Sequence, residues 1–203
     1  MTHSTTNGVR PPLALLLVTA LAAPAAAAQL VLDPASRLWI DGDSNVHAWT
    51  CSAPLHDFAA EAQSVDAPRV PGSLARLVTA VVIKEISCGD STMDGKLREA
   101  LKAGEHPRIT FVLSSYEATV EGTSAVIHAA GVLTIAGVAK TVVLTGTANR
   151  TGDHVQGRGS VALRMTDFGV SPPTALVGVL RTHDEITIRF DVQAALVEST
   201  TNP

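Results

Sequence analysis

Two cysteines offer the widest range of chemistry in this 203-residue chain. Cys51 and Cys88 could supply a nucleophile, bind a metal or form a disulfide. A nucleophilic thiolate needs a base within hydrogen-bonding reach. His47 precedes Cys51 by four residues, and on a strand that separation is about 13 Å. The spacing therefore disfavours a Cys–His dyad and leaves a disulfide or a metal pair.

The other polar motifs give little support for catalysis or metal binding. The seven histidines are scattered without the spacing of metal ligands. In His56-Asp57 and His183-Asp184 the neighbouring side chains would point to opposite faces of a strand. Asp167-Phe168-Gly169 matches a kinase tripeptide without the other kinase motifs, and Gly137–Lys140 lacks the spacing of a phosphate-binding loop. We expect no catalytic residue, metal or cofactor; His47, His183 and Asp184 are the residues to check.

Residues 1–28 have the layout of a secretory signal peptide. Arg10 charges the start, Leu13–Ala23 forms an apolar middle, and Ala26–Ala28 provides the small residues of a cleavage site. An uncleaved membrane anchor is the alternative, because the uncharged stretch is nearly long enough to span a bilayer. Pro24 interrupts that stretch, which favours cleavage.

Cleavage would leave a mature domain of residues 29–203 in the periplasm or outside the cell, without stable membrane insertion. Oxidising surroundings favour disulfide formation. In such a compartment Cys51 and Cys88 are predicted to pair.

Composition excludes further classes. The formal net charge is −4, with 15 Lys and Arg against 19 Asp and Glu. The sequence has no run of basic residues, so a nucleic-acid-binding surface is not expected. A chain that is 46% hydrophobic and 17% charged is not typical of disorder. The two Trp, one Tyr and four Phe are few. A core built from Val, Leu and Ile rather than rings favours an unfilled interior.

Alternating apolar and polar residues predict about eight strands separated by turn signals. The period of two is clearest in Ile186–Val192 and Ile109–Leu113. The other predicted strands are 37–41, 46–52, 58–62, 77–86, 125–135, 140–148 and 156–165. Strands at this close spacing predict an all-β sandwich or barrel.

One segment has a helical period instead. Apolar side chains recur every four residues from Met93 to Leu101, and Ser91–Asp94 resembles a capping box. Gly104 supplies a stop. We therefore predict a single amphipathic helix, about 93–103, between two strands.

Four motifs in chain order resemble the YceI-like family. Ser44–Trp49 is similar to its "S-x-V-x-x-F/W" strand, and Met93–Phe111 to its "MD…M…P-x-I-x-F" passage. Gly131–Lys140 resembles the "G-x-L-T-I-x-G-V-x-K" hairpin, and Asp167–Val170 the "D-F-G-[IV]" turn. The resemblance covers about residues 36–197. It implies a lipocalin-like, antiparallel eight-stranded barrel in the bacterial periplasm, with polyisoprenoid-type lipids as the ligand class.

The lumen of an eight-stranded barrel is either filled by side chains or holds one small ligand. The inward-facing side chains of the predicted strands, together with Phe168, are the candidate ligand-binding residues. They are Val81, Ile83, Phe111, Leu113, Leu133, Ile135, Leu163, Phe168, Ile188 and Phe190. The loop of residues 168–180 would either cover the mouth or complete the core.

The leading functional hypothesis is an exported lipid-binding protein, a carrier or scavenger of an isoprenoid-like or other amphipathic lipid. An apolar chain entering the lumen would gain about 0.8 kcal/mol per buried CH₂. The alternative is a cell-envelope interaction or stress-associated protein with a filled barrel and no ligand. An enzyme acting on a lipid head group would need a polar cluster at the mouth, which the sequence does not show.

Overall fold

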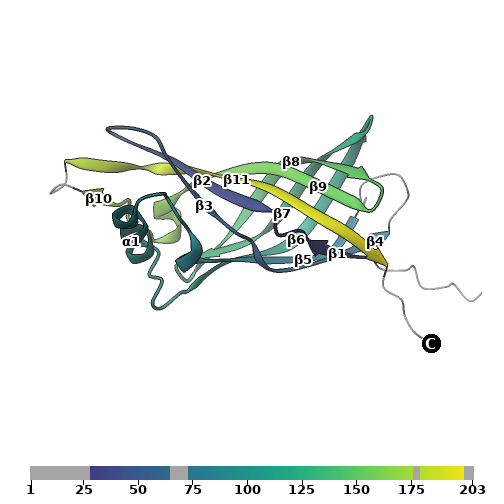
Figure 1. Cartoon of the computed structure of the whole chain (residues 1–203), viewed down its shortest axis with the longest axis horizontal. Helices are drawn as coiled ribbons and strands as arrows, with labels where there is room; N and C mark the ends of the chain where they lie inside the picture. Colours follow the sequence, from purple (N-terminus) through teal and green to yellow (C-terminus); the bar gives the residue numbers. More distant parts are fainter. Residues whose placement is uncertain (1–27, 65–72, 176–178, 199–203) are drawn as a thin grey trace, which may run out of the picture.

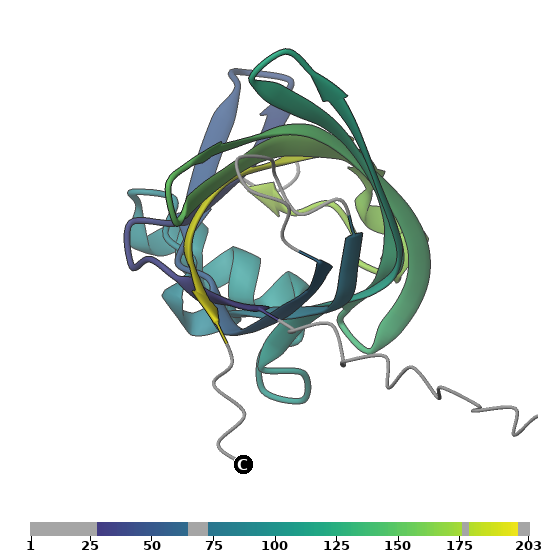
Figure 2. The same ribbon diagram turned by 90° about the vertical axis from the view of Figure 1, so that its right-hand side faces the viewer.

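The computed structural model describes residues 28–64, 73–175 and 179–198 (Figure 1). Eight antiparallel strands close into a barrel, which confirms the predicted all-β fold. The barrel strands are β1 (Ala28–Leu32), β4 (His56–Ser64), β5 (Ser73–Val82), β6 (Arg108–Glu121), β7 (Ser124–Ile135), β8 (Val138–Thr151), β9 (His154–Arg164) and β11 (Leu180–Glu198). Figure 2 shows the ring of strands seen along the barrel.

The 19-residue strand β11 closes the barrel. One edge of β11 pairs with β9. The other edge pairs first with β2 (Arg37–Ser44) and then, from Ala194 onward, with β1, which also pairs with β4. β3 (Trp49–Ala53) pairs with β2. The sequence predicted the β2–β3 hairpin with a turn at residues 41–44, but the strands stay paired to Gly42 and Trp49, so the turn lies further along the chain.

The tight hairpin between β7 and β8 shows why the local sequence folds as it does. Ile135 and Val138 are the last pair of the ladder, so Ala136 and Gly137 form a two-residue turn. Both turn residues have positive φ, 49° and 81°, the combination that matches the twist of a β-hairpin. Glycine adopts this conformation without strain. The hairpin predicted within Gly131–Lys140 is therefore present.

One end of the barrel carries short helices and is called here the helix end; the opposite end, with the β6–β7 and β8–β9 turns, is the hairpin end (Figure 1). The helix end holds η1 (Ile83–Glu85), α1 (Ser91–Ala100), η2 (Met165–Phe168) and the short strand β10 (Thr174–Ala175). A plug of buried apolar side chains fills this end. The plug includes Cys51, Ile83, Ile86, Leu101, Met165, Phe168 and Val170.

α1 is the predicted helix, beginning two residues earlier. Its cap is the Asp90 carboxylate, which accepts a hydrogen bond of 2.8 Å from the Met93 backbone N–H. The capping box expected at Ser91–Asp94 is therefore wrong, because Asp94 instead accepts from the Cys88 N–H at 2.7 Å. The strand expected over 77–86 ends at Val82, where the chain turns into η1 to bury Ile83.

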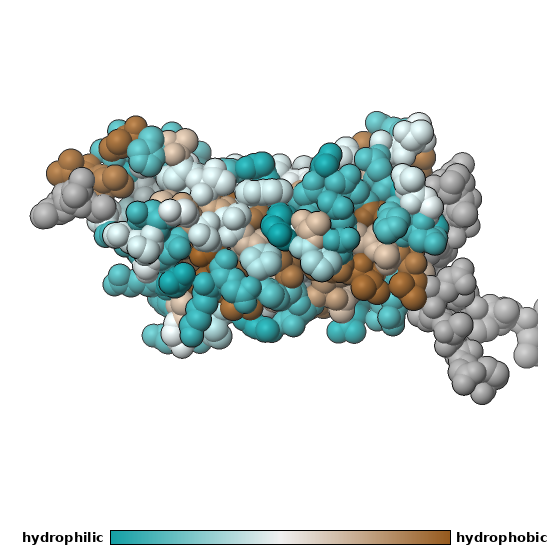
Figure 3. All heavy atoms as spheres, in the orientation of Figure 1, coloured by the Kyte–Doolittle hydropathy of each residue, from teal (hydrophilic) through white to brown (hydrophobic). Residues whose placement is uncertain are grey.

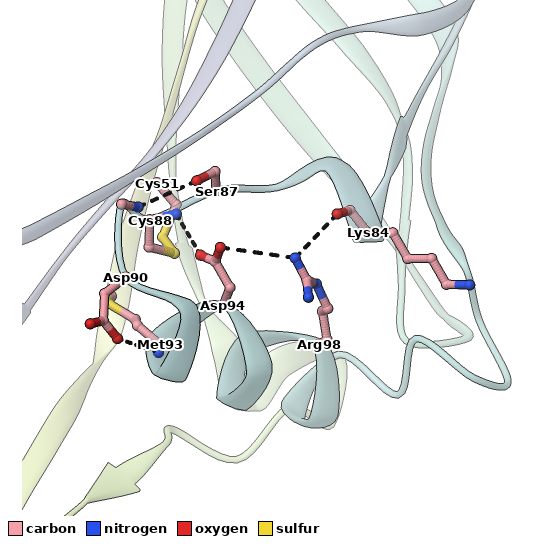
Figure 4. A network of polar contacts seen from close by, with 9 residues as sticks. Cys51, Lys84, Ser87, Cys88, Asp90, Met93, Asp94 and Arg98 are labelled. Carbon is pink, nitrogen blue, oxygen red and sulfur yellow. Dashed lines mark hydrogen bonds and ion pairs between the residues drawn. A yellow bond between two sulfur atoms is a disulfide. The ribbon is translucent and has the colours of Figure 1, made fainter.

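The predicted disulfide between Cys51 and Cys88 is confirmed, and it ties β3 to the segment that leads into α1. Beside it, Ser52 and Ser87 exchange backbone hydrogen bonds of 2.8 and 2.9 Å. Figure 4 shows the continuation of this network: Arg98 of α1 lies 3.9 Å from the Asp94 carboxylate and donates to the Lys84 carbonyl at 3.3 Å. The helix end is thus held by covalent and polar links around a buried core.

Reduction of the disulfide should lower the free energy of unfolding by about 4 kcal/mol, because the bond closes a loop between residues 37 apart. Urea unfolding with and without dithiothreitol measures the change. The Cys51→Ala/Cys88→Ala variant should be insensitive to the reductant. An unchanged midpoint for the reduced wild-type protein would contradict the prediction.

Candidate functional site

An apolar cavity of about 240 Å³ occupies the barrel lumen between the plug and the hairpin end. All eight barrel strands contribute to its wall. An apolar protein cavity of roughly 150 Å³, which is smaller than this one, can remain free of water and bind benzene. Figure 3 shows hydrophilic residues over much of the face in view, with apolar residues between them. The lumen thus has room for an apolar guest.

Six of the ten predicted ligand-binding residues lie in this wall. They are Val81, Phe111, Leu133, Ile135, Ile188 and Phe190. The other four lie outside the cavity lining. Ile83 and Phe168 are 0% and 2% exposed within the plug, and Leu113 and Leu163 pack against the same cluster. The participation of all ten in binding remains a prediction.

The start of the 168–180 loop completes the core, whereas Val179 near its end is 69% exposed. Phe168 and Val170 are buried in the plug at the helix end. Gly169, with φ of +67°, ends η2 in the left-handed conformation. Residues 176–178, which include two of the apolar residues of this loop, lie outside the described residues.

A β-bulge in β6 changes which side chains face the lumen. The β6–β7 register shifts between Leu113 and Ser115. One extra residue moves the following side chains to the other face, so Tyr116 lines the cavity beyond the bulge. Burial raises the pKa of Tyr116 to about 12. No local pattern in the sequence marks this shift, so Tyr116 was missed.

Small residues keep the lumen open. A Cβ at Gly131 would collide with the ring of Phe111, and one at Gly159 with the ring of Phe190. Each ring therefore lies against the wall over a glycine, where it takes up less of the lumen. Further small residues of the lining are Ala60, Ala129, Gly146, Ala148, Gly157 and Ala194. The alternation of inward and outward positions in β7 and β8 places several of these small residues on the inner face, so the sequence pattern alone can identify them.

The polar side chains in the inner wall are few. Thr79 and Tyr116 are the inward-facing examples among the described residues that line the cavity. The Thr79 hydroxyl donates to the His56 carbonyl at 3.3 Å. Within the described ranges, no group of three or more His, Cys, Asp or Glu could hold a metal ion. The wall offers apolar contact rather than acid–base chemistry.

The three residues singled out for an enzymatic role lie outside the lumen. His47 lies in the β2–β3 turn with Nδ1 2.9 Å from the Ala48 carbonyl. His183 and Asp184 belong to β11 and line an outer groove. Asp184 accepts hydrogen bonds from the Thr166 N–H at 2.9 Å and hydroxyl at 2.6 Å. These bonds lower the pKa of Asp184 and fasten η2 to β11.

The barrel wall has an incomplete ladder at the hairpin end. β5 and β6 pair only from Val78–Val112 to Val82–Arg108. Beyond Val78 the rest of β5 pairs with β4 alone. Leu74 and Leu77, which line the cavity beside this gap, are partly exposed.

A closed eight-stranded antiparallel barrel around an apolar lumen defines the class of lipocalin-like barrels. Within that class, the chain belongs to the YceI-like family: the model of the YceI-like domain matches residues 36–194. The family resemblance stated from the sequence is confirmed. No curated protein matches the chain.

Several solved structures share the fold. BcnA from Burkholderia cenocepacia is 22% identical with a TM-score of 0.63, over 81% of this chain and 99% of that protein. A polyisoprenoid binding domain from Saccharophagus degradans, implicated in plant cell wall breakdown, is 11% identical with a TM-score of 0.60, over 85% and 99%. The Campylobacter jejuni YCEI protein is 22% identical with a TM-score of 0.53, over 70% and 82%. At these identities the likeness establishes the fold.

Asp184→Asn should weaken the attachment of η2 and lower the free energy of unfolding at neutral pH. The folded-state pKa of Asp184 lies below the ordinary value of 3.8, so the carboxylate stabilises the fold above that pH and this contribution is lost as the pH falls through the lowered pKa. The difference between wild type and variant should therefore shrink in acid. Chemical unfolding from pH 7 to pH 2.5 measures it.

Asp153→Asn, at a largely exposed carboxylate in the β8–β9 turn, is the matched control. It should change stability little at any pH. A pH-independent loss for Asp184→Asn would show that ionisation of this carboxylate does not matter.

Proposed function

We propose that this protein binds an amphipathic lipid of the isoprenoid type, with the apolar chain of the lipid in the barrel lumen. The observation that carries the proposal is the apolar cavity of about 240 Å³. Each CH₂ buried there contributes about 0.8 kcal/mol, without any catalytic group. A polyisoprenoid binding domain among the structural neighbours supports the same ligand class.

The proposed role is that of a carrier or scavenger in the periplasm or outside the cell. The Cys51–Cys88 disulfide supports an oxidising compartment. The proposed signal peptide, residues 1–28, lies outside the described residues except for Ala28, which begins β1. Among the described residues, no helix has both the length and the apolar character needed to cross a bilayer.

A binding protein fits the lumen better than an enzyme or a filled scaffold. Among the described residues, the polar side chains that face the cavity are a threonine with a backbone partner and a half-buried tyrosine. A filled barrel, as the envelope-interaction hypothesis requires, would place large side chains where this barrel has Ala60, Ala129 and Ala148. The cavity therefore favours ligand binding.

Native mass spectrometry of gently purified protein tests the proposal. We expect a co-purifying lipid, or uptake of a fluorescent prenyl alcohol by the delipidated protein. Absence of both would contradict the proposed function.

Leu133→Trp should reduce prenyl alcohol affinity at least ten-fold, because the larger ring would fill the lumen. Val132→Trp is the matched control. Val132 precedes Leu133 on β7 and is 36% exposed on the outer face, so its substitution should leave affinity unchanged. Fluorescence titration measures both, and circular dichroism checks the fold. Since overpacking destabilises by about 1–3 kcal/mol, the milder Ala129→Leu provides a second test. Unchanged affinity in a folded lumen variant would place the ligand elsewhere.

A further inference from the structure

The barrel wall is interrupted between β8 and β9 near the helix end. The β8–β9 ladder runs from the hairpin end only as far as Thr145 and Ser160. Both strands continue: residues 138–144 of β8 pair with β7, and residues 161–164 of β9 pair with β11. The two continuing segments do not pair with each other. We call residues 138–144 and 161–164 the β8–β9 seam.

A groove on the outer surface follows this seam and borders the lumen. Its lining includes Lys140–Val143 from β8 and Val161–Arg164 from β9. Val142 and Val161 line the groove and also the apolar cavity. Val142 and Val161 come from two segments that do not pair with each other, and their side chains lie between the groove and the lumen. A small separation of these segments would connect the two spaces.

Lys140 shows that the groove reaches an inward-facing position of β8. Its register partner is Leu133, a residue of the cavity wall, so Lys140 occupies an inward-facing position. An unpaired ammonium group in an apolar interior is strongly unfavourable. Lys140 is nevertheless exposed and lines the groove, so this inward-facing position is open to water from the groove side.

The two sides of the seam suit the two parts of an amphiphile. The lumen has few polar partners for a head group, whereas the groove has charged side chains and the backbone groups of two unpaired strand edges. The charged residues of the groove are Asp41, Asp43, Lys140, Arg164, Asp167, Asp184 and Glu185. The groove has more carboxylates than cations. Asp41 is paired with Arg189, but the other carboxylates still make the local charge negative. Such a surface favours an uncharged polar head over a phosphate.

We propose that the β8–β9 seam is a lateral route into the lumen. The apolar chain of an uncharged amphiphile, such as a prenyl alcohol, passes between Val142 and Val161 while its polar head stays in the groove. This inference rests on the proposed function and adds the route and the head-group class.

Cross-linking the seam tests the route. Continuing the β8–β9 register would place Val143 opposite Ala162, and both residues are exposed. The V143C/A162C variant, bridged by a short bifunctional thiol reagent while the native disulfide stays oxidised, should take up fluorescent prenyl alcohol at least ten-fold more slowly than the unbridged variant. The T145C/S160C variant, bridged across the last pair of the existing ladder, should take it up at the unbridged rate.

A third bridge, R76C/S114C, spans the β5–β6 gap at the hairpin end. It should leave uptake unchanged. Full-speed uptake by the bridged V143C/A162C protein, or slow uptake only in bridged R76C/S114C, would overturn the lateral route. Failure of every unbridged protein to bind the alcohol would instead overturn the proposed function.

Competition by prenyl phosphate of the same chain length tests the head-group class. The phosphate should bind at least ten-fold more weakly than the alcohol. Equal or tighter binding would overturn the preference for an uncharged head.

Discussion

Closure of the sheet by β11 is the constraint on which the rest of the structure depends. Because β11 pairs with β9 on one edge and with β2 and β1 on the other, the first and last strands meet and the sheet forms a tube. An eight-stranded tube is just wide enough to be filled by side chains or to hold one small ligand. The sizes of the inward-facing side chains therefore decide whether the barrel is solid or hollow.

Side-chain size divides the interior of this barrel into two parts. At the helix end, large aliphatic and aromatic residues such as Ile83, Leu101 and Phe168 pack into a plug around the disulfide. Toward the hairpin end, Ala129 and Ala148 face inward, and alanine leaves much of the cross-section unfilled. Four of the seven aromatic residues nevertheless line the cavity, namely Phe58, Phe111, Tyr116 and Phe190. Phe111 and Phe190 do face the lumen, but each lies over a glycine.

The features that could be predicted from sequence depend on near neighbours in the chain, and those that could not depend on register. Alternation identified most strands, the four-residue period identified α1, and Ala136-Gly137 lies in the predicted hairpin. The bulge after Leu113 escaped prediction because it is defined only by the pairing of β6 with β7. Tyr116 and the residues beyond it were therefore assigned no role. The five-residue strand β1 was missed because it is short and follows a Leu/Ala-rich segment, and only its pairing with β4 and β11 identifies it.

The plug and the seam have a common physical origin. η2 follows β9 directly, and its Met165 and Phe168 turn inward to fill the helix end. Two hydrogen bonds from Thr166 to Asp184 hold η2 against β11, so the end of β9 follows β11. The start of β8 is held to β7 by the tight Ala136-Gly137 turn. The two strands are thus fastened to different neighbours, and their own ladder stops at Thr145 and Ser160. Filling one end of the barrel and leaving a gap in its wall are consequences of the same local fold.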